Sequence, residues 1–388
     1  MAAVRILLCA SEAPRAPLNG SRLVLNQLCT RLAERAEVTV LALRHPDQAG
    51  EAPAGVELYE LALSPAGRGR AWALRGAALA LREPVEARRL SAPFVSFLPE
   101  FLASRSFDVA HVMLGTLAPI APALGGLPAV IAPLDAWHRN VHAEVDSATG
   151  LERVWRRTQE QAVRHFEARA YRPFKRVVLV TDEDAREVSR LDPSLATATI
   201  PNGVDAAHFA PPPDGAARNG ILFTGALDAP SNEQAALRLA ERIMPLVRRS
   251  VPDAALKLVG RSPGPRLRAL EGVEVIADVP DLRPYLWSAG VYACPMVSGT
   301  GIKNKLLEAM AAGAPAVATP LACQGLAVRD GVEVRVADSD ADFAAALVAV
   351  LRDPAGLASA ARAYVSARHD WDAVAAAYFA VYEHAVTA

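Results

Sequence analysis

The chain has few cysteines, no excess of charge of either sign, and no long apolar run without helix breakers. Its four cysteines, Cys9, Cys29, Cys294 and Cys323, are scattered and form no C-x-x-C pair. This spacing argues against a zinc site or a disulfide framework and is typical of a reducing compartment. The net charge of −1 gives no support for wholesale nucleic-acid binding, so we expect no nucleic-acid partner.

No segment predicts a signal peptide or a membrane-spanning helix. Met1–Ala10 is too short and wrongly flanked for a signal peptide. Val112–Leu134 carries no charge and is long enough to cross a bilayer. Prolines and glycines interrupt it, so we interpret it as two buried strands with a loop between them. These features favour a cytoplasmic protein, and the apolar runs around Cys9 and Cys294 predict buried thiols.

The composition predicts a two-domain α/β protein. A chain of 388 residues is longer than one core usually holds, and 52% hydrophobic with 21% charged residues is typical of a compact fold. The chain opens with a strand at Val4–Ala10, a loop at Pro14–Ser21, an amphipathic helix and a strand at Val38–Leu43. The loop lacks G-x-G-x-x-G, which argues against a hydride-transfer dehydrogenase.

The most informative stretch is 291–319. Val291–Pro295 reads as a buried strand, and Gly299 and Gly301 follow in a loop that can turn backbone N–H groups toward a ligand. A helix comes next, capped by Thr300 or Asn304, with Leu306 at core spacing and an end at Gly313 before Pro315. Ala316–Thr319 begins the next strand, giving a strand, glycine loop, helix and strand in succession.

Three charged residues give this unit its chemistry. Lys303 and Lys305 lie at the helix start, where the macrodipole also favours an anion. Glu308 follows Lys305 by three residues, so both side chains emerge on one helix face. Cations for a diphosphate and a carboxylate for a ribose diol would together bind a nucleoside diphosphate. A solvated Lys/Glu face on an ordinary helix is the alternative.

Ser298–Thr319 resembles the nucleotide-sugar motif of the family 4 retaining glycosyltransferases. The subgroup that it resembles most reads Gly-Thr-Gly-Ile-Lys-Asn-Lys-x-Leu-Glu-Ala-Met-Ala and includes sugar transferases of exopolysaccharide and exosortase-linked gene clusters. The resemblance implies that Glu308 accepts hydrogen bonds from the ribose. Many relatives carry a second glutamate where this chain has Thr300, so the contacts to the donor sugar differ here.

The resemblance implies a GT-B fold, with two Rossmann-like domains facing each other across a cleft. Residues 1–200, with a closing helix at about 371–388, would form the acceptor-side domain, and 201–370 the domain that binds the nucleotide sugar. Ile-Pro-Asn-Gly-Val-Asp at 200–205 resembles the family's entry to the interdomain linker and brings Asn202 to the donor site.

In the first domain the resemblance points to three residues. Gly20, in the loop after the first strand, would lie near the donor phosphates, with a plain turn as the alternative. Asp135 and His138 follow the strand at Ala129–Pro133, and polar residues at the carboxyl end of a parallel strand point into the ligand crevice. Either could lie near the donor sugar as a catalytic residue, with His142 as a further histidine nearby, and a purely structural role is open for both.

In the second domain the family often holds the donor diphosphate with an Arg and a Lys after the first strand. This chain has Ala226 and Asn232 at those places, so we infer that the charge has moved to Lys303 and Lys305, which we also expect to be catalytic. Arg261 is a secondary phosphate candidate. The donor-binding set expected from the resemblance is Gly20, Asn202, Gly225, Arg261, Val279, Gly299, Thr300, Gly301, Lys303, Lys305, Leu306 and Glu308.

The expected function is transfer of a sugar from a nucleotide-diphosphate sugar, with retention of configuration, to a glycan, a lipid-linked sugar or a small natural product. The lysines would replace a metal, and no Asp-x-Asp motif stands in a suitable place, so neither metal nor cofactor is expected. A non-catalytic nucleotide-sugar-binding subunit and a sugar epimerase on the same fold are the alternatives. The arginines between 68 and 89 read as a solvated helix face, or as a basic edge for a lipid-linked acceptor at the inner membrane face.

Overall fold

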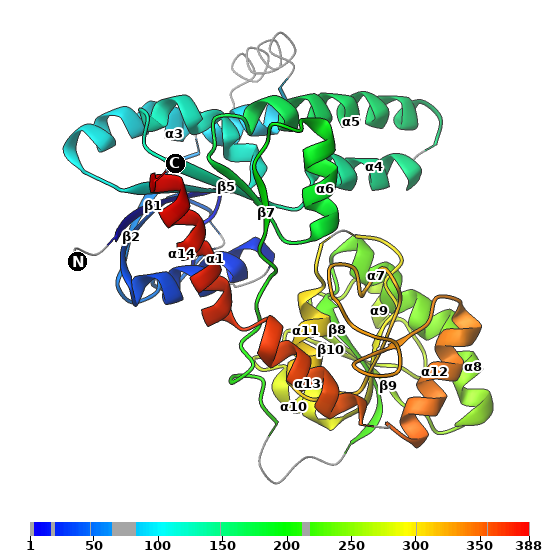
Figure 1. The fold of residues 1–388 in the computed structure, drawn as a ribbon. Helices are drawn as coiled ribbons and strands as arrows, with labels where there is room; N and C mark the ends of the chain where they lie inside the picture. The colour runs from blue at the N-terminus through cyan, green and yellow to red at the C-terminus, as the bar shows by residue number, and fades with distance from the viewer. Residues whose placement is uncertain are drawn as a thin grey trace. The chain divides into compact units, whose positions relative to one another are not determined.

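The structure is a computed structural model that describes residues 4–16, 20–46, 48–63, 83–147, 149–211, 218–299, 301–354 and 356–387. The chain divides into two compact units, Met1–Pro201 with Trp371–Ala388, and Asn202–Asp370. Each unit is built on one sheet, and every strand pair in both sheets is parallel. The predicted α/β class with two Rossmann-like sheets is therefore confirmed (Figure 1).

The sheet of the first unit has the strand order β3-β2-β1-β4-β5-β6-β7. Its strands are β1 Val4–Ala10, β2 Ala36–Leu43, β3 Val56–Leu61, β4 Val109–Met113, β5 Ala129–Leu134, β6 Arg176–Leu179 and β7 Thr197–Thr199. Its helices are α1 Gly20–Ala33, α3 Val85–Ser104, the 3-10 helix η1 Gly115–Leu124, α4 Trp137–Ser147, α5 Gly150–Ala170, α6 Asp182–Leu191 and α14 Trp371–Thr387.

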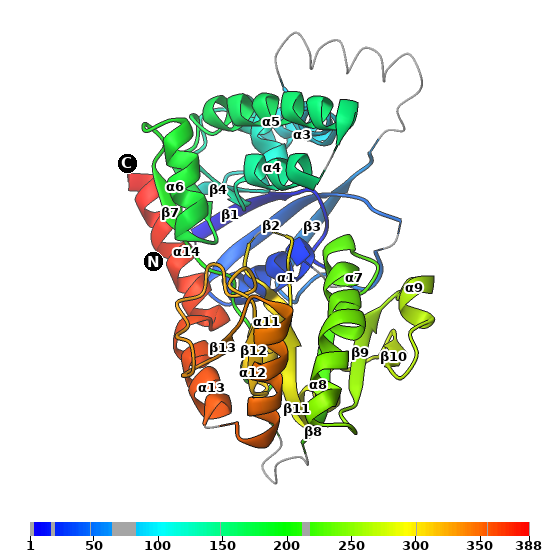
Figure 2. The same cartoon turned by 90° about the vertical axis from the view of Figure 1, so that its right-hand side faces the viewer.

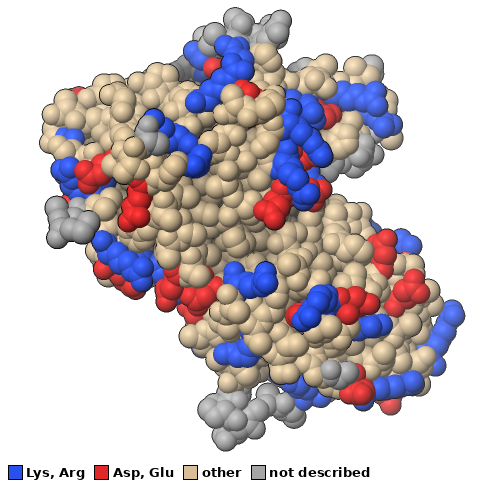
Figure 3. Space-filling model, viewed as in Figure 1, with Lys and Arg blue, Asp and Glu red and all other residues tan. Residues whose placement is uncertain are grey.

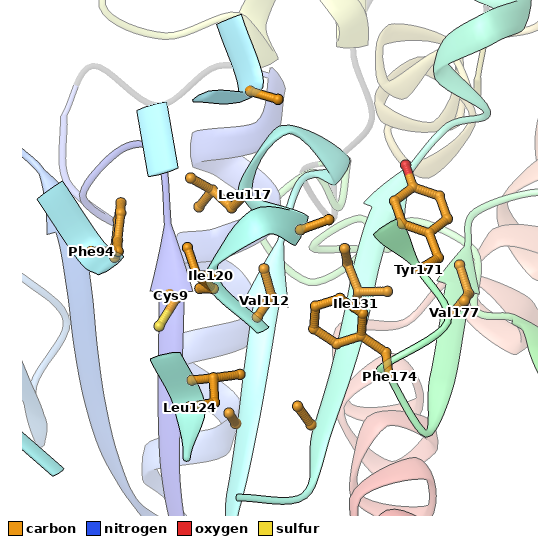
Figure 4. Packing of buried hydrophobic residues seen from close by; sticks show 14 of the residues in the cluster. Cys9, Phe94, Val112, Leu117, Ile120, Leu124, Ile131, Tyr171, Phe174 and Val177 are labelled. Carbon is orange, nitrogen blue, oxygen red and sulfur yellow. The ribbon is translucent and has the colours of Figure 1, made fainter. Parts of the chain in front are cut away.

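Alternation along β1 divides the core of this unit between the two faces of the sheet. Leu7 and Cys9 pack with residues of α3, η1 and α5 in one buried cluster, part of which is shown in Figure 4. Ile6 and Leu8 pack with residues of α1 and α14 in the other. Because helices cover both faces (Figure 2), the strands are apolar on both sides, as parallel sheets require.

The C-terminal helix α14 is an integral part of the first unit. Trp371, Tyr378 and Tyr382 are buried in the cluster formed by α1 and the sheet. The Nδ1 atom of His111, on β4, lies 2.7 Å from the hydroxyl of Tyr382. His111 is thus a structural histidine, and burial lowers its pKa to about 3.

The sheet of the second unit has the order β10-β9-β8-β11-β12-β13. Its strands are β8 Asn219–Ala226, β9 Leu256–Arg261, β10 Glu274–Ala277, β11 Ala289–Cys294, β12 Ala316–Ala318 and β13 Arg335–Val336. Its helices are α7 Pro230–Leu237, the π-helix η2 Arg238–Ile243, α8 Met244–Ser250, α9 Pro265–Arg268, α10 Arg283–Ser288, α11 Asn304–Ala311, α12 Asp340–Arg352 and α13 Leu357–Arg368.

Most local predictions are confirmed, and two are wrong. The strand predicted at Val4–Ala10 is β1 with the same bounds, and the strand predicted at Ala129–Pro133 is β5. The segment between β4 and β5 is the 3-10 helix η1 rather than a loop. Asn304 does not cap α11, because it is already the first helical residue and Lys303 occupies the N-cap position with no side-chain cap. Thr300, the other candidate cap, lies outside the described residues.

The basic stretch expected at 68–89 falls largely outside the described residues. On α3, Phe94 and Phe101 are buried in the core of the first unit. Where Figure 3 shows described side chains, basic and acidic groups are interspersed. Within the described ranges no single helix is long and apolar enough to cross a membrane, although α12 and α13 pass that test as a bent pair.

Two backbones approach each other closely at the carboxyl end of the β8–β9 pair in the second sheet. Gly225 on β8 pairs with Gly260 on β9. A Cβ atom on Gly260 would lie 1.8 Å from the carbonyl oxygen of Gly225. Only glycine fits there, because backbone atoms cannot move aside as a flexible side chain can.

We therefore expect Gly260→Ala to destabilise the protein by about 3 kcal/mol, the upper part of the range for overpacked cores. Gly264→Ala is the matched control, since its Cβ would meet only the side-chain carboxylate of Glu233, at 3.2 Å. Urea denaturation of the two variants measures the difference, and equal midpoints would contradict the assigned close approach.

Candidate functional site

The strand order of the second unit creates a topological switch point between β8 and β11. The chain runs outward from β8 to β9 and β10 and then returns to the opposite side of β8 as β11. Ligands of open parallel sheets bind outside the carboxyl ends of the strands at such a point. Here those ends are Ala226 and Cys294, and the glycine loop follows directly after β11.

The glycine loop is shaped by its backbone and by its own lysine. Gly299 and Gly301 have φ angles of 100° and 67°, in the region that favours glycine. Lys303 is 7% exposed, and its Nζ donates to the carbonyl oxygens of Gly299, at 3.2 Å, and Gly301, at 2.7 Å. The Lys303 ammonium thus links two backbone carbonyl groups of the loop.

Lys305 instead reaches across the switch point. Its Nζ donates to Oδ1 of Asn232 on α7, and it lies 5.5 Å from the ring centroid of Phe223 on β8. It also lies 3.9 Å from the sulfur of Met296. Burial lowers the pKa of Lys305, so this cation is poorly hydrated by its surroundings and strongly attracts an anion.

Asn232 occupies the position where the resembled family often has a lysine. In this chain the ammonium of Lys305 comes to that side chain from α11. Asn232 is held in turn by donating from Nδ2 to the carbonyl oxygen of Ala226, at 2.8 Å. A Cβ on Gly225 would lie 3.4 Å from Cε of Lys305 and 3.2 Å from Nδ2 of Asn232, so the glycine leaves room for this arrangement.

Glu308 lies one turn further along α11 and is half-buried. Burial raises its pKa to about 7, and the nearby Lys305 opposes that rise. Burial raises the pKa of the neighbouring Tyr292, and the negative charge of Glu308 adds a smaller effect in the same direction. Glu308 is therefore a carboxylate held in a poorly hydrated place, as expected for a group that accepts hydrogen bonds from a ligand.

The other predicted residues of this unit lie around the same edge. Nδ2 of Asn202 donates to Oδ1 of Asn304 at the start of α11, at 3.2 Å. Arg261 ends β9, is largely exposed, and pairs with Asp228 at 3.4 Å. Val279 follows β10, and Leu306 is fully buried, so only its backbone is available to a ligand.

The predicted residues of the first unit lie at the carboxyl edge of its own sheet. Gly20 is the first residue of α1, and Asp135 is half-buried just after β5. His138 is 1% exposed. Its Nδ1 lies 2.6 Å from Oε2 of Glu167, and its Nε2 is buried with no hydrogen-bond partner among the described residues. Glu167 was not expected from the sequence, because its place on α5 gives no local signal of a contact 29 residues away.

Backbone strain marks the same edges. The described non-glycine residues with positive φ are Leu114, Leu134, Ser262 and Asp278, which stand at the carboxyl ends of β4, β5, β9 and β10. Conformations of this kind cost about 1–3 kcal/mol each and concentrate at functional sites. The identities of these four residues did not predict their positive φ angles.

The chemistry offered by the described residues is that of an anion site and a hydroxyl-accepting carboxylate. No group of three or more His, Cys, Asp or Glu residues in the described ranges could hold a metal ion. Lys305, the first turn of α11 and the glycine loop supply positive charge and backbone donors for a diphosphate.

Solved structures with the same fold cover nearly the whole chain. Sucrose-phosphate synthase from Thermosynechococcus elongatus has a TM-score of 0.74 at 17% identity over 98% of each chain. Anabaena HepE in complex with UDP and glucose has a TM-score of 0.65 at 15% identity over 97% of this chain and 99% of that chain. These likenesses define the GT-B class of fold.

Two family models match the sequence. Residues 18–208 match "Glycosyltransferase Family 4" and residues 218–353 match "Glycosyl transferases group 1". The chain belongs to the family 4 glycosyltransferases.

The curated relatives that we found are transferases named for inositol-containing compounds. A phosphatidyl-myo-inositol mannosyltransferase from Mycolicibacterium smegmatis is 36% identical over 47% of this chain and 51% of its own length. A D-inositol 3-phosphate glycosyltransferase from Mycobacterium avium is 31% identical over 54% of this chain and 55% of its own length. The chain thus spans about half the length of the relatives it matches. The expected exopolysaccharide or exosortase-linked subgroup is not supported, because these relatives are named for inositol compounds instead. That expectation rested on the glycine-loop motif alone.

The raised pKa of Glu308 predicts a conflict between stability and binding. A folded-state pKa near 7, above the usual Glu value of about 4.3, means that the folded protein loses stability as pH rises between those two values. Glu308→Gln should therefore raise the melting temperature at pH 8 and change it little at pH 4.

Thermal unfolding at the two pH values measures this effect. Glu274→Gln is the control, since that carboxylate is exposed on β10. A Glu308→Gln melting temperature at pH 8 equal to or below that of the unchanged protein would contradict the buried-charge interpretation.

Proposed function

We propose that this protein transfers a hexosyl group from a nucleotide-diphosphate sugar to an acceptor hydroxyl, with retention of configuration. The observation that carries the proposal is the position of Lys305, a partly desolvated cation at the switch point beside a glycine loop. Glu308, one turn further on, completes the features that a nucleoside diphosphate needs: positive charge for the phosphates and a carboxylate for the ribose diol.

The proposed chemistry assigns Lys305 to the leaving group. The diphosphate gains negative charge as the glycosidic bond breaks, so a fixed cation there acts mainly in the transition state. Backbone N–H groups of the glycine loop and the first turn of α11 add to this effect. The base and ribose lie beside Glu308 and the backbone near Val279, and no metal is required for these contacts.

Lys303 has a different proposed role. Its ammonium already binds two carbonyl oxygens of the glycine loop. We assign it to holding the loop in shape rather than to the diphosphate, so the two lysines no longer form an equivalent pair.

The first unit supplies the proposed acceptor side, with Asp135 and His138 near the donor sugar. The names of the relatives support an inositol that carries a phosphate as the acceptor, either in a phosphatidyl-inositol lipid or in an inositol phosphate. We propose the lipid form, because phosphatidylinositol is named in more of the relatives found. This acceptor would bring the protein to a membrane surface.

A two-stage assay tests the function. Thermal-shift measurements with UDP-, GDP-, dTDP- and ADP-sugars identify the donor, because a ligand of the folded state raises the melting temperature. Donor consumption is then followed with and without phosphatidylinositol vesicles or inositol phosphate, and the anomeric configuration of the product is read by NMR. Acceptor-dependent consumption with retention supports the proposal. Sugar interconversion without acceptor indicates an epimerase, and binding without turnover a non-catalytic subunit.

The two lysines should respond differently to substitution. Lys305→Met should lower kcat by at least about a hundredfold while the protein stays folded, the scale for loss of one preorganised oxyanion donor. Lys303→Met should cost about 1–3 kcal/mol of stability, because it leaves loop carbonyls without their charged donor. Lys257→Met is the control, since this half-exposed lysine on β9 pairs only loosely with Glu274, at 3.6 Å.

Steady-state kinetics and thermal unfolding separate the two effects. Normal turnover in Lys305→Met would show that Lys305 does not stabilise the leaving diphosphate. Loss of activity in EDTA, restored by magnesium or manganese, would show that a metal performs its task.

A further inference from the structure

Glu167 is a buried carboxylate in the first unit with several hydrogen-bond donors around it. Glu167 lies on α5, its side chain is fully buried, and both of its oxygens accept hydrogen bonds. Oε1 accepts from the backbone N–H of Trp137, at 2.9 Å, and from the hydroxyl of Tyr171, at 3.3 Å. Oε2 accepts from the backbone N–H of His138, at 3.1 Å, and lies 2.6 Å from its Nδ1.

These donors determine the protonation of the pair. The two backbone N–H groups belong to the first turn of α4, where the helix dipole favours a negative charge. With donors at both oxygens the carboxyl group needs no proton of its own, so the Nδ1 atom of His138 must be the donor to Oε2. A neutral imidazole with its proton on Nδ1 then presents a lone pair on Nε2.

Nε2 is the unsatisfied end of this arrangement. It is buried and has no partner among the described residues. An unpaired buried acceptor costs about 1–3 kcal/mol, so the arrangement is unfavourable unless a ligand pairs with it. His138 is the second residue of α4 and lies at the carboxyl edge of β5, four residues after the strained Leu134. Ligands of parallel sheets lie at this edge.

Gly115 leaves the space in which Tyr171 reaches this carboxylate. A Cβ on Gly115, the first residue of η1, would lie 2.1 Å from the hydroxyl oxygen of Tyr171. The hydroxyl thus fills the space that a side chain would take and reaches Glu167 from there. Segments that follow β4 and β5 therefore meet at one buried carboxylate.

We propose that Glu167 is a positioning residue, which holds His138 with its proton on Nδ1 so that Nε2 accepts a hydrogen bond from a substrate hydroxyl. This rests on the proposed function, in which the hydroxyl belongs to the transferred sugar. Glu167 itself does not touch the substrate.

The tautomer can be measured without any assay of activity. The protein is labelled with ¹⁵N-histidine, and the signals of His138 are assigned by their loss in His138→Gln. We expect a protonated Nδ1 and an unprotonated Nε2 at pH 7.5, although free histidine favours the opposite tautomer. A proton on Nε2, alone or together with Nδ1, would overturn the inference even if the protein proves to be a glycosyltransferase.

Kinetics supply the second test. A glutamine at position 167 places its NH₂ group against a backbone N–H whichever way the amide turns. Glu167→Gln should therefore release the tautomer and lower kcat by roughly tenfold or more, with nucleotide affinity unchanged. Tyr171→Phe is the matched control, because it removes one donor from the same carboxylate and leaves the histidine contact intact. It should keep the Nδ1–H tautomer and a near-normal kcat.

Equal kcat values for Glu167→Gln and Tyr171→Phe would overturn the positioning role. If neither the unchanged protein nor any variant turns over a donor while the expected tautomer is observed, the proposed function fails and the histidine geometry stands. If Glu167→Gln does not fold, the tautomer in the unchanged protein decides the question.

Discussion

Every paired strand of this protein runs in the same direction as its neighbour, and the rest of the structure depends on that constraint. Parallel pairing brings all carboxyl ends to one edge of each sheet, and the chain must cross back between paired strands, in most of these connections through a helix. Loops that are distant in sequence therefore meet at that edge. Lys305 and Asn232 come together because α11 follows β11 and α7 follows β8, on either side of the switch point.

Apolar periodicity and the positions of glycine and proline were sufficient to predict several strands and helices. Apolar runs predicted β1, β2 and β11. Gly299 and Gly301 were identifiable because the loop needs left-handed backbone that other residues resist. Local chemistry decides all of these features, so a single sequence carries them.

The finer features of the candidate site depend on contacts that local sequence does not encode. Lys303 and Lys305 look alike in sequence, but one faces the loop carbonyls and the other crosses to a different helix. Glu167 becomes informative only when α5 is packed on α4. The positive φ angles of Leu114 and Leu134 are imposed by the surrounding tertiary structure, since leucine itself disfavours them. These details belong to tertiary structure.

The position of α14 has a consequence for the order in which the protein becomes complete during synthesis. Its residues Trp371, Tyr378 and Tyr382 fill the core on one face of the first sheet, although they are translated after the entire second unit. The N-terminal unit therefore lacks part of its core while the later unit, continuous from Asn202 to Asp370, can finish folding. Until α14 has been made, the apolar residues that it covers in the folded protein are open to contacts with other chains.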